Sequence, residues 1–331
     1  MTTATLSPRA AAFYSKLYIE ALGPKLVYGR HGVKENMKPN SGKKIDFQKY
    51  EDLPAATTQL KEGVTPVGMS IIKRPVSADI AQYGSWTGIS DVVELVSLDP
   101  EVTKIVEKLG KQAGLTMDTV LRDSLLAGTN EFYAGSVLSR DSVTSNLTDT
   151  DFKKIVRTLK RANVEEITAM IDPSTGISTV PVAPSYICIG HTDLEMSLRA
   201  LESSGFIPIE KYPSQRKVFE GEVGAGWGIR FILTTNAPII AGAGGTATSG
   251  VKATGGKTDI YQTIIFGQDA YAEVPLNKGS TGIILKLHSK SDTSDTSDPL
   301  NQRSTAGWKA MYASLILDDD RLVRYEHGVL E

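Results

Sequence analysis

The stretch of this sequence most suggestive of ligand chemistry is rich in glycine and runs from residue 241 to residue 258. Its end, Gly255-Gly256-Lys257-Thr258, is similar to the end of a phosphate-binding loop, in which backbone N–H groups and a lysine hold phosphates. That motif needs a further glycine five residues before the last one, and Val251 occupies this position. Moving the first glycine to Gly250 puts Gly256 where the lysine should be. The phosphate-loop motif is therefore incomplete.

The first part of the same stretch, residues 242–247, fits a dinucleotide-binding fingerprint only loosely. No helix-forming sequence follows it, so there is no helix N-terminus to hold a pyrophosphate. We therefore expect residues 241–258 to form a flexible loop with almost no packing side chains. A nucleotide-binding enzyme is the alternative from a different class, and it predicts nucleotide binding that Lys257→Ala abolishes.

The histidines and the single cysteine give no catalytic or metal-binding pattern either. Cys188 lies in the apolar run at residues 186–189, which predicts a buried, inert thiol in a strand. A lone cysteine also excludes an intrachain disulfide and a cysteine zinc cluster. The histidines are widely spaced and form no His-Glu-x-x-His motif; they are His31, His191, His288 and His327.

Two acidic groups were candidates for cation binding. Asp292, Asp295 and Asp298 are spaced by three, whereas a calcium-binding EF-hand loop spaces its first ligands by two and needs a later glutamate. Residues 318–320 are three consecutive aspartates, which we interpret as a solvated turn able at most to bind a cation weakly. We therefore predict no catalytic, cofactor-binding or metal-binding residues, no cofactor and no enzymatic activity.

Basic residues gather near the start of the chain. They face either phosphates or acidic residues of another subunit, and the pattern does not decide between these partners. The cluster consists of Lys25, Arg30, Lys34, Lys38, Lys43 and Lys44.

Composition describes a folded chain without strong bias. With 331 residues, 40% hydrophobic and 22% charged, the chain is long enough for two domains or one elaborated domain. A net charge of −2 argues against strong chain-wide attraction to nucleic acid or anionic membranes. No signal peptide and no apolar run of about 18 residues is visible, so we expect synthesis in a reducing cytoplasm and no membrane span.

The element around which the chain is organised is a long helix predicted over residues 99–128. Asp99 is a suitable N-cap, Pro100 suits the first helical position, and apolar residues recur at helical spacing up to a stop at Gly128. Such a helix is about 40 Å long at about 1.5 Å per residue. The helix could bend or break at Gly110 or Gly114, because each glycine costs roughly 1 kcal/mol of helix stability relative to alanine.

Strands and helices are otherwise segregated, which predicts an α+β fold rather than alternating βαβ units. We expect a basic, extended arm over 25–40 that lies on something else, and a hairpin or edge strands within 64–98. Thr148 is expected to cap a helix, and residues 192–195 to form a capping box. The other predictions are a helix over 7–23, strands at 44–50, 186–189, 229–233, 260–275 and 282–287, a polar loop at 289–299, and a hairpin-like close over 308–325.

Several blocks of the chain, in an unbroken order, resemble one group of tailed-bacteriophage major capsid proteins. The group comprises the coat proteins of short-tailed phages with a large virion polymerase, and many prophages. The opening Ser-Pro-Arg-Ala-Ala-Ala-Phe-Tyr carries part of the resemblance, which runs nearly end to end. The remaining blocks are residues 26–29, 40–50, 61–66, 82–86, 90–91, 99–100, 109–114, 266–271, 298–302 and 307–309.

The resemblance implies the capsid fold shared by tailed phages and herpesviruses, with four parts. These would be an N-terminal arm at 1–40, an extended β-hairpin loop at 41–97, and a peripheral domain at 98–182 and 288–331 with its spine helix at 99–128. The axial domain would be residues 183–287, with the glycine-rich loop close to a capsomer axis or on a surface.

The function implied is that of a major capsid subunit which self-assembles into hexamers and pentamers of an icosahedral head around double-stranded DNA. The DNA would be enclosed without sequence-specific binding, and no membrane would be involved. Expected partners are copies of the chain, a separate scaffolding protein, a portal and decoration proteins, with assembly in the host cytoplasm and a final place in the virion capsid. A bacterial nanocompartment shell is the alternative within this fold, and it would need a pocket for cargo peptides.

Overall fold

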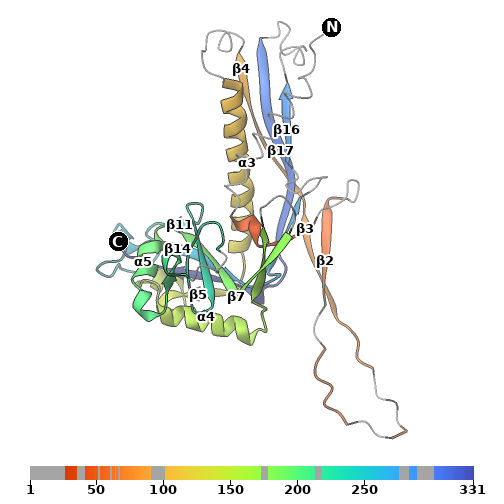
Figure 1. Ribbon diagram of the computed structural model, residues 1–331, viewed down its shortest axis with the longest axis vertical. Helices are drawn as coiled ribbons and strands as arrows, with labels where there is room; N and C mark the ends of the chain where they lie inside the picture. The colour runs from red at the N-terminus through yellow and green to blue at the C-terminus, as the bar shows by residue number, and fades with distance from the viewer. Residues whose placement is uncertain are drawn as a thin grey trace.

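The computed structural model shows an elongated subunit with one long helix, two main sheets and a projecting hairpin (Figure 1). The structure describes residues 27–35, 42–50, 53–59, 62–63, 65, 68–90, 101–172, 178–212, 218–275, 283–288 and 302–331. The predicted helix at 7–23, the polar loop at 289–299 and the Asp99-Pro100 start of the long helix lie outside these residues.

The predicted long helix is confirmed as α3, Glu101–Leu126. It runs unbroken through Gly110 and Gly114, both of which are buried, so the possible break does not occur. Thr116 donates its hydroxyl hydrogen to the backbone oxygen of Gln112 within the helix instead of capping a second one. The predicted apolar stripe faces the core through Val106, Leu109, Ala113, Met117, Leu121 and Leu125.

The spine α3 covers one face of a five-stranded sheet. In this sheet β17, Arg303–Ile316, pairs along one side with β4, Ala81–Ser90. Along its other side β17 pairs with β16 and β15, and the short β1 completes that edge. Trp308 of β17 is buried against the helix and donates its indole N–H to the Gln112 side chain at 3.2 Å. The remaining strands are β1 (Val33–Lys34), β15 (Tyr271–Pro275) and β16 (Ile283–His288).

The hairpin consists of β2, Lys44–Tyr50, and β3, Lys73–Asp79, with the connecting residues 51–72. The two strands pair antiparallel in the register Lys44 opposite Asp79 and Tyr50 opposite Lys73. The predicted strand at 44–50 is confirmed, with alternating half-buried and exposed side chains. Only the base of the hairpin contacts the body, where half-buried Ile45 and Phe47 pack on the face of the five-stranded sheet opposite α3. Figure 1 shows the rest of the hairpin projecting away from the body.

The second sheet has nine strands in the order β5-β18-β14-β7-β10-β9-β8, with β11 beside β14 and β6 beside β7. The predicted buried strand at 186–189 is confirmed in β7, where the side chains of Tyr186 to Ile189 are fully or almost fully buried. The strand bounds are β5 (Glu131–Tyr133), β6 (Ile167–Asp172), β7 (Ser178–His191), β8 (Ile207–Pro208), β9 (Glu222–Gly226), β10 (Ile229–Thr234), β11 (Ile239–Ile240), β14 (Ile260–Phe266) and β18 (Leu322–His327).

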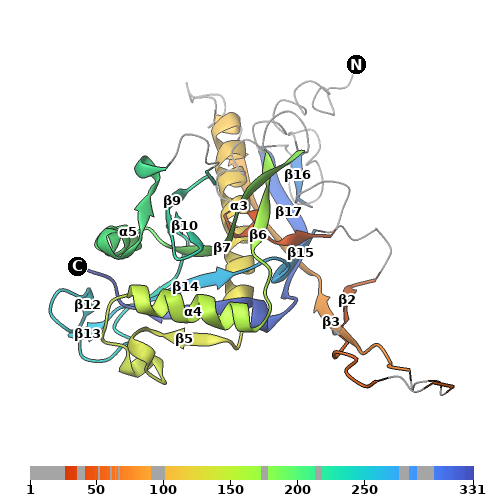
Figure 2. The same ribbon diagram turned by 60° about the horizontal axis from the view of Figure 1, so that its bottom comes forward.

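Two helices accompany the nine-stranded sheet (Figure 2). The helix α4, Asp149–Arg161, begins at Thr148, whose side chain accepts the Asp151 N–H, so this predicted cap is confirmed. The helix α5, Leu194–Arg199, lacks the predicted capping box. Its N-cap is Asp193, without a side-chain capping bond, and Glu195 pairs with Arg199 instead. The short 3₁₀ segments are Tyr28–Arg30, Ala134–Ser136, Arg140–Ser142, Glu202–Ser204, Ile209–Lys211 and Asp319–Arg321.

The end of the chain is not the hairpin that its sequence suggests. The strands β17 and β18 follow each other but lie in different sheets, β17 beside β4 and β18 between β14 and β5. The turn at 318–320 therefore connects the two sheets. Sheet membership also crosses the expected domain boundaries, because β15 and β16 lie with β17, whereas β18 lies in the nine-stranded sheet.

Candidate assembly surfaces

The hairpin presents large apolar side chains to solvent. Tyr50 at the end of β2, and four residues of the connecting segment, are each more than half exposed. An isolated two-stranded ribbon is marginally stable in water, and exposed apolar residues at this density indicate a surface that becomes buried. The four connecting residues are Leu53, Met69, Ile71 and Ile72.

A second apolar side chain is exposed on the long sheet. Trp86 of β4 is 71% exposed and lies opposite Gly307 of β17. Trp308, the next residue of β17, points to α3, so Gly307 and Trp86 lie on the other face of the sheet. A Cβ atom at Gly307 would lie only 2.8 Å from the Trp86 Cβ, which explains why a glycine is tolerated here in mid-strand. The face of the sheet opposite α3 therefore carries an exposed aromatic side chain.

Residues 27–35, which we call the strap, lie across α3 and the edge of the five-stranded sheet. The Asp118 carboxylate of α3 accepts the N–H groups of Val27 and Tyr28, each at 2.8 Å. Tyr28 is completely buried, and its carbonyl accepts the hydroxyl of Tyr271. Beyond it, β1 pairs parallel with β15. This part of the predicted arm thus packs on the core of its own subunit.

Two of the basic residues of the arm have acidic partners within the same chain. Arg30 pairs with Glu220 at 3.0 Å, and Lys34 pairs with Glu273 at 2.9 Å. Arg30 and Lys34 thus have partners within their own subunit, which neither of the two alternatives named. Lys25 and Lys38 lie outside the described residues.

Asp118 is the functional residue that sequence reasoning missed. It is 1% exposed on the apolar face of α3 and also accepts the amide of Asn236 at 2.8 Å. Burial raises the pKa of its carboxyl, although the hydrogen bonds from Asn236 and the strap oppose that shift. A lone aspartate directly after Met117 in a helical apolar stripe was the available signal, since a buried carboxylate needs donors.

The glycine-rich stretch is an ordered, packed turn and not the flexible loop expected. The strands β12, Ala253–Thr254, and β13, Lys257–Thr258, form a small hairpin within it. Gly245 donates its N–H to the Val143 carbonyl, and a Cβ at Gly244 would lie 2.6 Å from the same oxygen. These glycines allow close backbone approach. The antiparallel strand β14 follows and Lys257 is exposed, so the loop lacks the helix N-terminus of a phosphate site.

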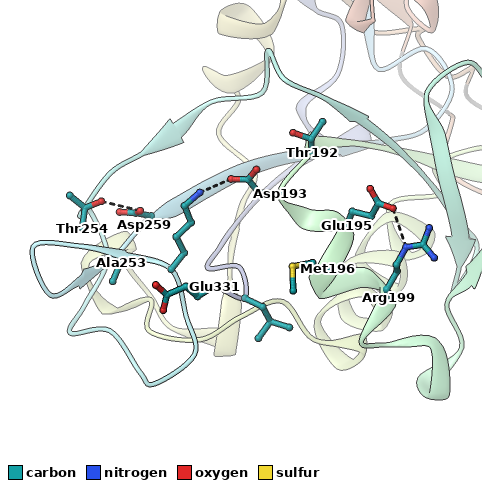
Figure 3. A pocket seen from close by; sticks show the side chains of 11 residues that line it. Thr192, Asp193, Glu195, Met196, Arg199, Ala253, Thr254, Asp259 and Glu331 are labelled. Carbon is teal, nitrogen blue, oxygen red and sulfur yellow. Dashed lines mark hydrogen bonds and ion pairs between the residues drawn. The ribbon is translucent and has the colours of Figure 1, made fainter.

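A pocket of about 590 Å³ lies between α5, the glycine-rich stretch and the end of the chain (Figure 3). Both of its basic residues are paired: Arg199 with Glu195, and Lys252 with Asp193 at 2.8 Å. Asp193 also accepts the Tyr261 hydroxyl at 2.7 Å. Burial acts to raise the pKa of Asp193, but the hydrogen bonds from Lys252 and Tyr261 hold that pKa below its ordinary value. Paired charges of this kind stabilise the surface and supply no free acid or base for catalysis.

The histidines do not come together, and Cys188 is fully buried in β7, where burial raises the pKa of its thiol. His31 packs edge-on against Phe219, with ring centroids 5.2 Å apart. The ring of His191 lies in the paired network beside Asp193, and His288 belongs to β16. In the part of the chain that the structure describes, no three histidine, cysteine or acidic side chains converge on one point.

His327 of β18 has a pKa lowered to about 4 by complete burial. Its Nδ1 donates to the Gly328 carbonyl, which leaves Nε2 to accept the Thr263 hydroxyl in the neutral form. The unfolded chain takes up a proton near pH 6.5 and the folded one does not, so stability falls as pH decreases from 6.5 towards 4. We expect His327 to remove about 2 kcal/mol of unfolding free energy between pH 7 and pH 5. Urea denaturation at both pH values measures this decrease. Glutamine does not titrate, so an equally large decrease in unfolding free energy between pH 7 and pH 5 in His327→Gln would contradict the prediction.

Of the three aspartates at 318–320, Asp319 and Asp320 are exposed, as expected of a solvated turn, whereas Asp318 is not. Asp318 is mostly buried, pairs with Lys49 of the hairpin and accepts the Asp320 N–H. Asp319 accepts the hydroxyl of Thr129. The turn therefore fastens the hairpin base to the body and has no free carboxylate cluster for a cation. None of the described helices is both long and apolar enough to cross a membrane.

The exposed apolar side chains of the hairpin are typical of a subunit that buries surface in a larger assembly. The family model described as phage capsid protein matches residues 73–324, and the chain belongs to this family. It is thus a structural capsid subunit of a bacteriophage and not an enzyme, it assembles with copies of itself, and its place is the capsid of the virion.

Solved capsid structures share the fold at low sequence identity. The capsid of cyanophage P-SCSP1u is 15% identical with a TM-score of 0.60, covering 91% of this chain and 88% of that one. The capsid of Ralstonia phage GP4 is 13% identical with a TM-score of 0.61, covering 92% and 90%. Cyanophage Pam1 gives 10% identity, a TM-score of 0.57 and coverage of 94% and 92%. The search of curated proteins found no match. The predicted α+β capsid fold of tailed phages is confirmed.

Proposed function

We propose that this chain is the major capsid protein of a short-tailed phage of the group with a large virion polymerase, forming hexamers and pentamers of an icosahedral head around double-stranded DNA. The resembling sequence blocks support the group. The observation that carries the assembly mode is the hairpin, whose apolar residues are left exposed by the part of the chain that the structure describes. Six- and fivefold rings of one chain supply a surface for them on a neighbour.

This proposal keeps the four parts but not all of their bounds. The arm at 1–40 and the extended loop at 41–97 are unchanged, whereas the peripheral domain at 98–182 and 288–331 and the axial domain at 183–287 exchange segments. The five-stranded sheet with α3 supports a peripheral unit, and the nine-stranded sheet supports an axial one. Because β15 and β16 lie beside β17, we place 271–288 with the peripheral sheet and β18 with the axial sheet.

The partners proposed besides the chain itself are a separate scaffolding protein, a portal and decoration proteins, with assembly in the host cytoplasm. A nanocompartment shell is less well supported, because ion pairs of Lys252 with Asp193 and of Arg199 with Glu195 line the pocket of Figure 3 and disfavour an apolar cargo peptide.

Electron microscopy of the purified full-length chain, with and without its scaffolding protein, tests the proposal. We expect closed particles or separate rings with five- and sixfold symmetry, because the exposed hairpin is buried only in a lattice. Sedimentation as a monomer under all assembly conditions would contradict the proposal. Saturable nucleotide binding lost in Lys257→Ala would favour an enzyme instead.

A further inference from the structure

The helix α4 has an unusual concentration of positive charge on its solvent side. Its 13 residues include five basic and two acidic ones, whereas the whole chain has 36 basic and 38 acidic residues. One of the two acids, Asp151, is buried and accepts the Tyr325 hydroxyl, so it faces the core. The basic residues are Lys153, Lys154, Arg157, Lys160 and Arg161, all exposed except for the half-buried Lys154.

Local interactions account for only part of this charge. Lys153 pairs with Asp149 at 2.8 Å and Lys160 with Glu166 at 3.4 Å. Arg157 and Arg161 have no ion-pair partner among the residues that the structure describes. The helix dipole favours cations in the last turn, which explains Lys160 and Arg161 but neither Arg157 nor the two lysines in the first half of α4.

The spacing places three of these charges in one line. Lys153, Arg157 and Arg161 are four residues apart, so they lie on one face of the helix along about 12 Å. A DNA duplex carries one negative charge per about 1.7 Å of its axis, so a line of this length lies beside several phosphates. Figure 2 shows α4 lying along the outside of the nine-stranded sheet.

The chemistry of the face selects among anionic partners. The large apolar residues of α4, such as Phe152, Ile155 and Leu159, are completely buried beneath the helix. A membrane-bound helix needs apolar side chains to insert, and a protein interface needs a buried anchor, and the solvent side of α4 offers neither. Lysine and arginine side chains are the groups that most often contact a phosphate backbone.

We infer that the solvent face of α4 binds the phosphate backbone of double-stranded DNA without reading its sequence. The inference rests on the proposed function, since a head filled with DNA supplies this ligand at high concentration. It adds a specific contact surface to a chain whose overall charge of −2 predicts no such attraction.

The test measures binding of a fluorescent duplex of about 30 base pairs to the soluble full-length subunit between about 50 and 300 mM NaCl. The variant Lys153→Gln/Arg157→Gln/Arg161→Gln is expected to bind about tenfold more weakly or worse at low salt and to reduce the slope of log affinity against log salt by about 3. The single variant Arg157→Gln is expected to reduce it by about 1.

The matched control is Lys104→Gln/Lys108→Gln/Lys111→Gln, which removes three exposed charges from α3, where Lys111 pairs with Glu107. Its affinity should equal that of the unaltered chain. Equal DNA binding by the α4 variant and the control would overturn the inference, and so would tighter binding of polyglutamate than of the duplex. Particle formation is scored separately by electron microscopy. Particles without DNA binding overturn the inference alone, whereas a chain that forms no particles overturns the proposed function.

Discussion

Replacing residues 51–72 with the dipeptide Asn-Gly is expected to abolish particle formation while the subunit remains folded. Tyr50 and Lys73 are opposite each other in the β2–β3 register, so a two-residue turn can close the hairpin there. The replacement removes Leu53, Met69 and two isoleucines, whose burial contributes roughly 1.5–3 kcal/mol each. Because every subunit of a lattice repeats this contact, its loss multiplies across the shell.

The measurement is the yield of particles by sedimentation and electron microscopy, beside the thermal midpoint of the soluble subunit. Thr57→Ala/Thr58→Ala is the control in the same segment, and it should assemble normally. Deleting residues 60–90 would be uninformative, because it also removes β3 and β4, which pair with β2 and β17. Normal particle yield from the shortened hairpin would refute the assembly mode proposed above.

Asp118→Ala should destabilise the subunit by about 2–6 kcal/mol and release the strap. The substitution leaves the N–H groups of Val27 and Tyr28 without their acceptor in a buried site, and each such group costs about 1–3 kcal/mol. Completely buried Tyr28 would then lose the contacts that hold it against α3. Urea denaturation gives the free energy of unfolding, and limited proteolysis reports release of the strap.

The matched variant for this experiment is Asp118→Asn, which keeps one oxygen as acceptor for the strap. The loss of unfolding free energy should be smaller than in Asp118→Ala, because an acceptor remains. It should not be zero, because a neutral acceptor forms weaker hydrogen bonds than a carboxylate. An unfolding free energy within 1 kcal/mol of the unaltered protein in Asp118→Ala would show that the strap is held by other contacts.

Patterns confined to one element were predicted well from the sequence. The alternation over 44–50 and the apolar stripe of α3 depend on the periods of strand and helix, which the side-chain types reveal directly. The Thr148 cap is likewise a contact over three residues. The capping box at Thr192 failed because Asp193, the actual N-cap, binds Lys252 and Tyr261, which are distant in the sequence.

Pairings between distant segments were the part that sequence reasoning could not supply. Two consecutive β patterns at 308–325 favour a hairpin, yet each strand pairs with a distant segment instead, β17 with the long strand β4 and β18 with the fully buried β14. The glycine-rich stretch has few side chains that can pack, which favours a flexible loop. In the structure its glycines allow the backbone of Val143 to pack closely against it, so the stretch is ordered. For the assembly surfaces, the sequence indicates only that the arm and the hairpin lack a core of their own. For Asp118, it shows only a polar residue within an apolar stripe.

The position of β18 has a consequence for the order of events during synthesis. Six residues near the C-terminus, Leu322–His327, lie between β5 and β14, and all six are buried. The other sheet likewise needs β17 to join β4, more than 200 residues earlier. During synthesis neither sheet can therefore be completed before β17 and β18 have been made, because each strand closes a sheet through pairings of high sequence separation.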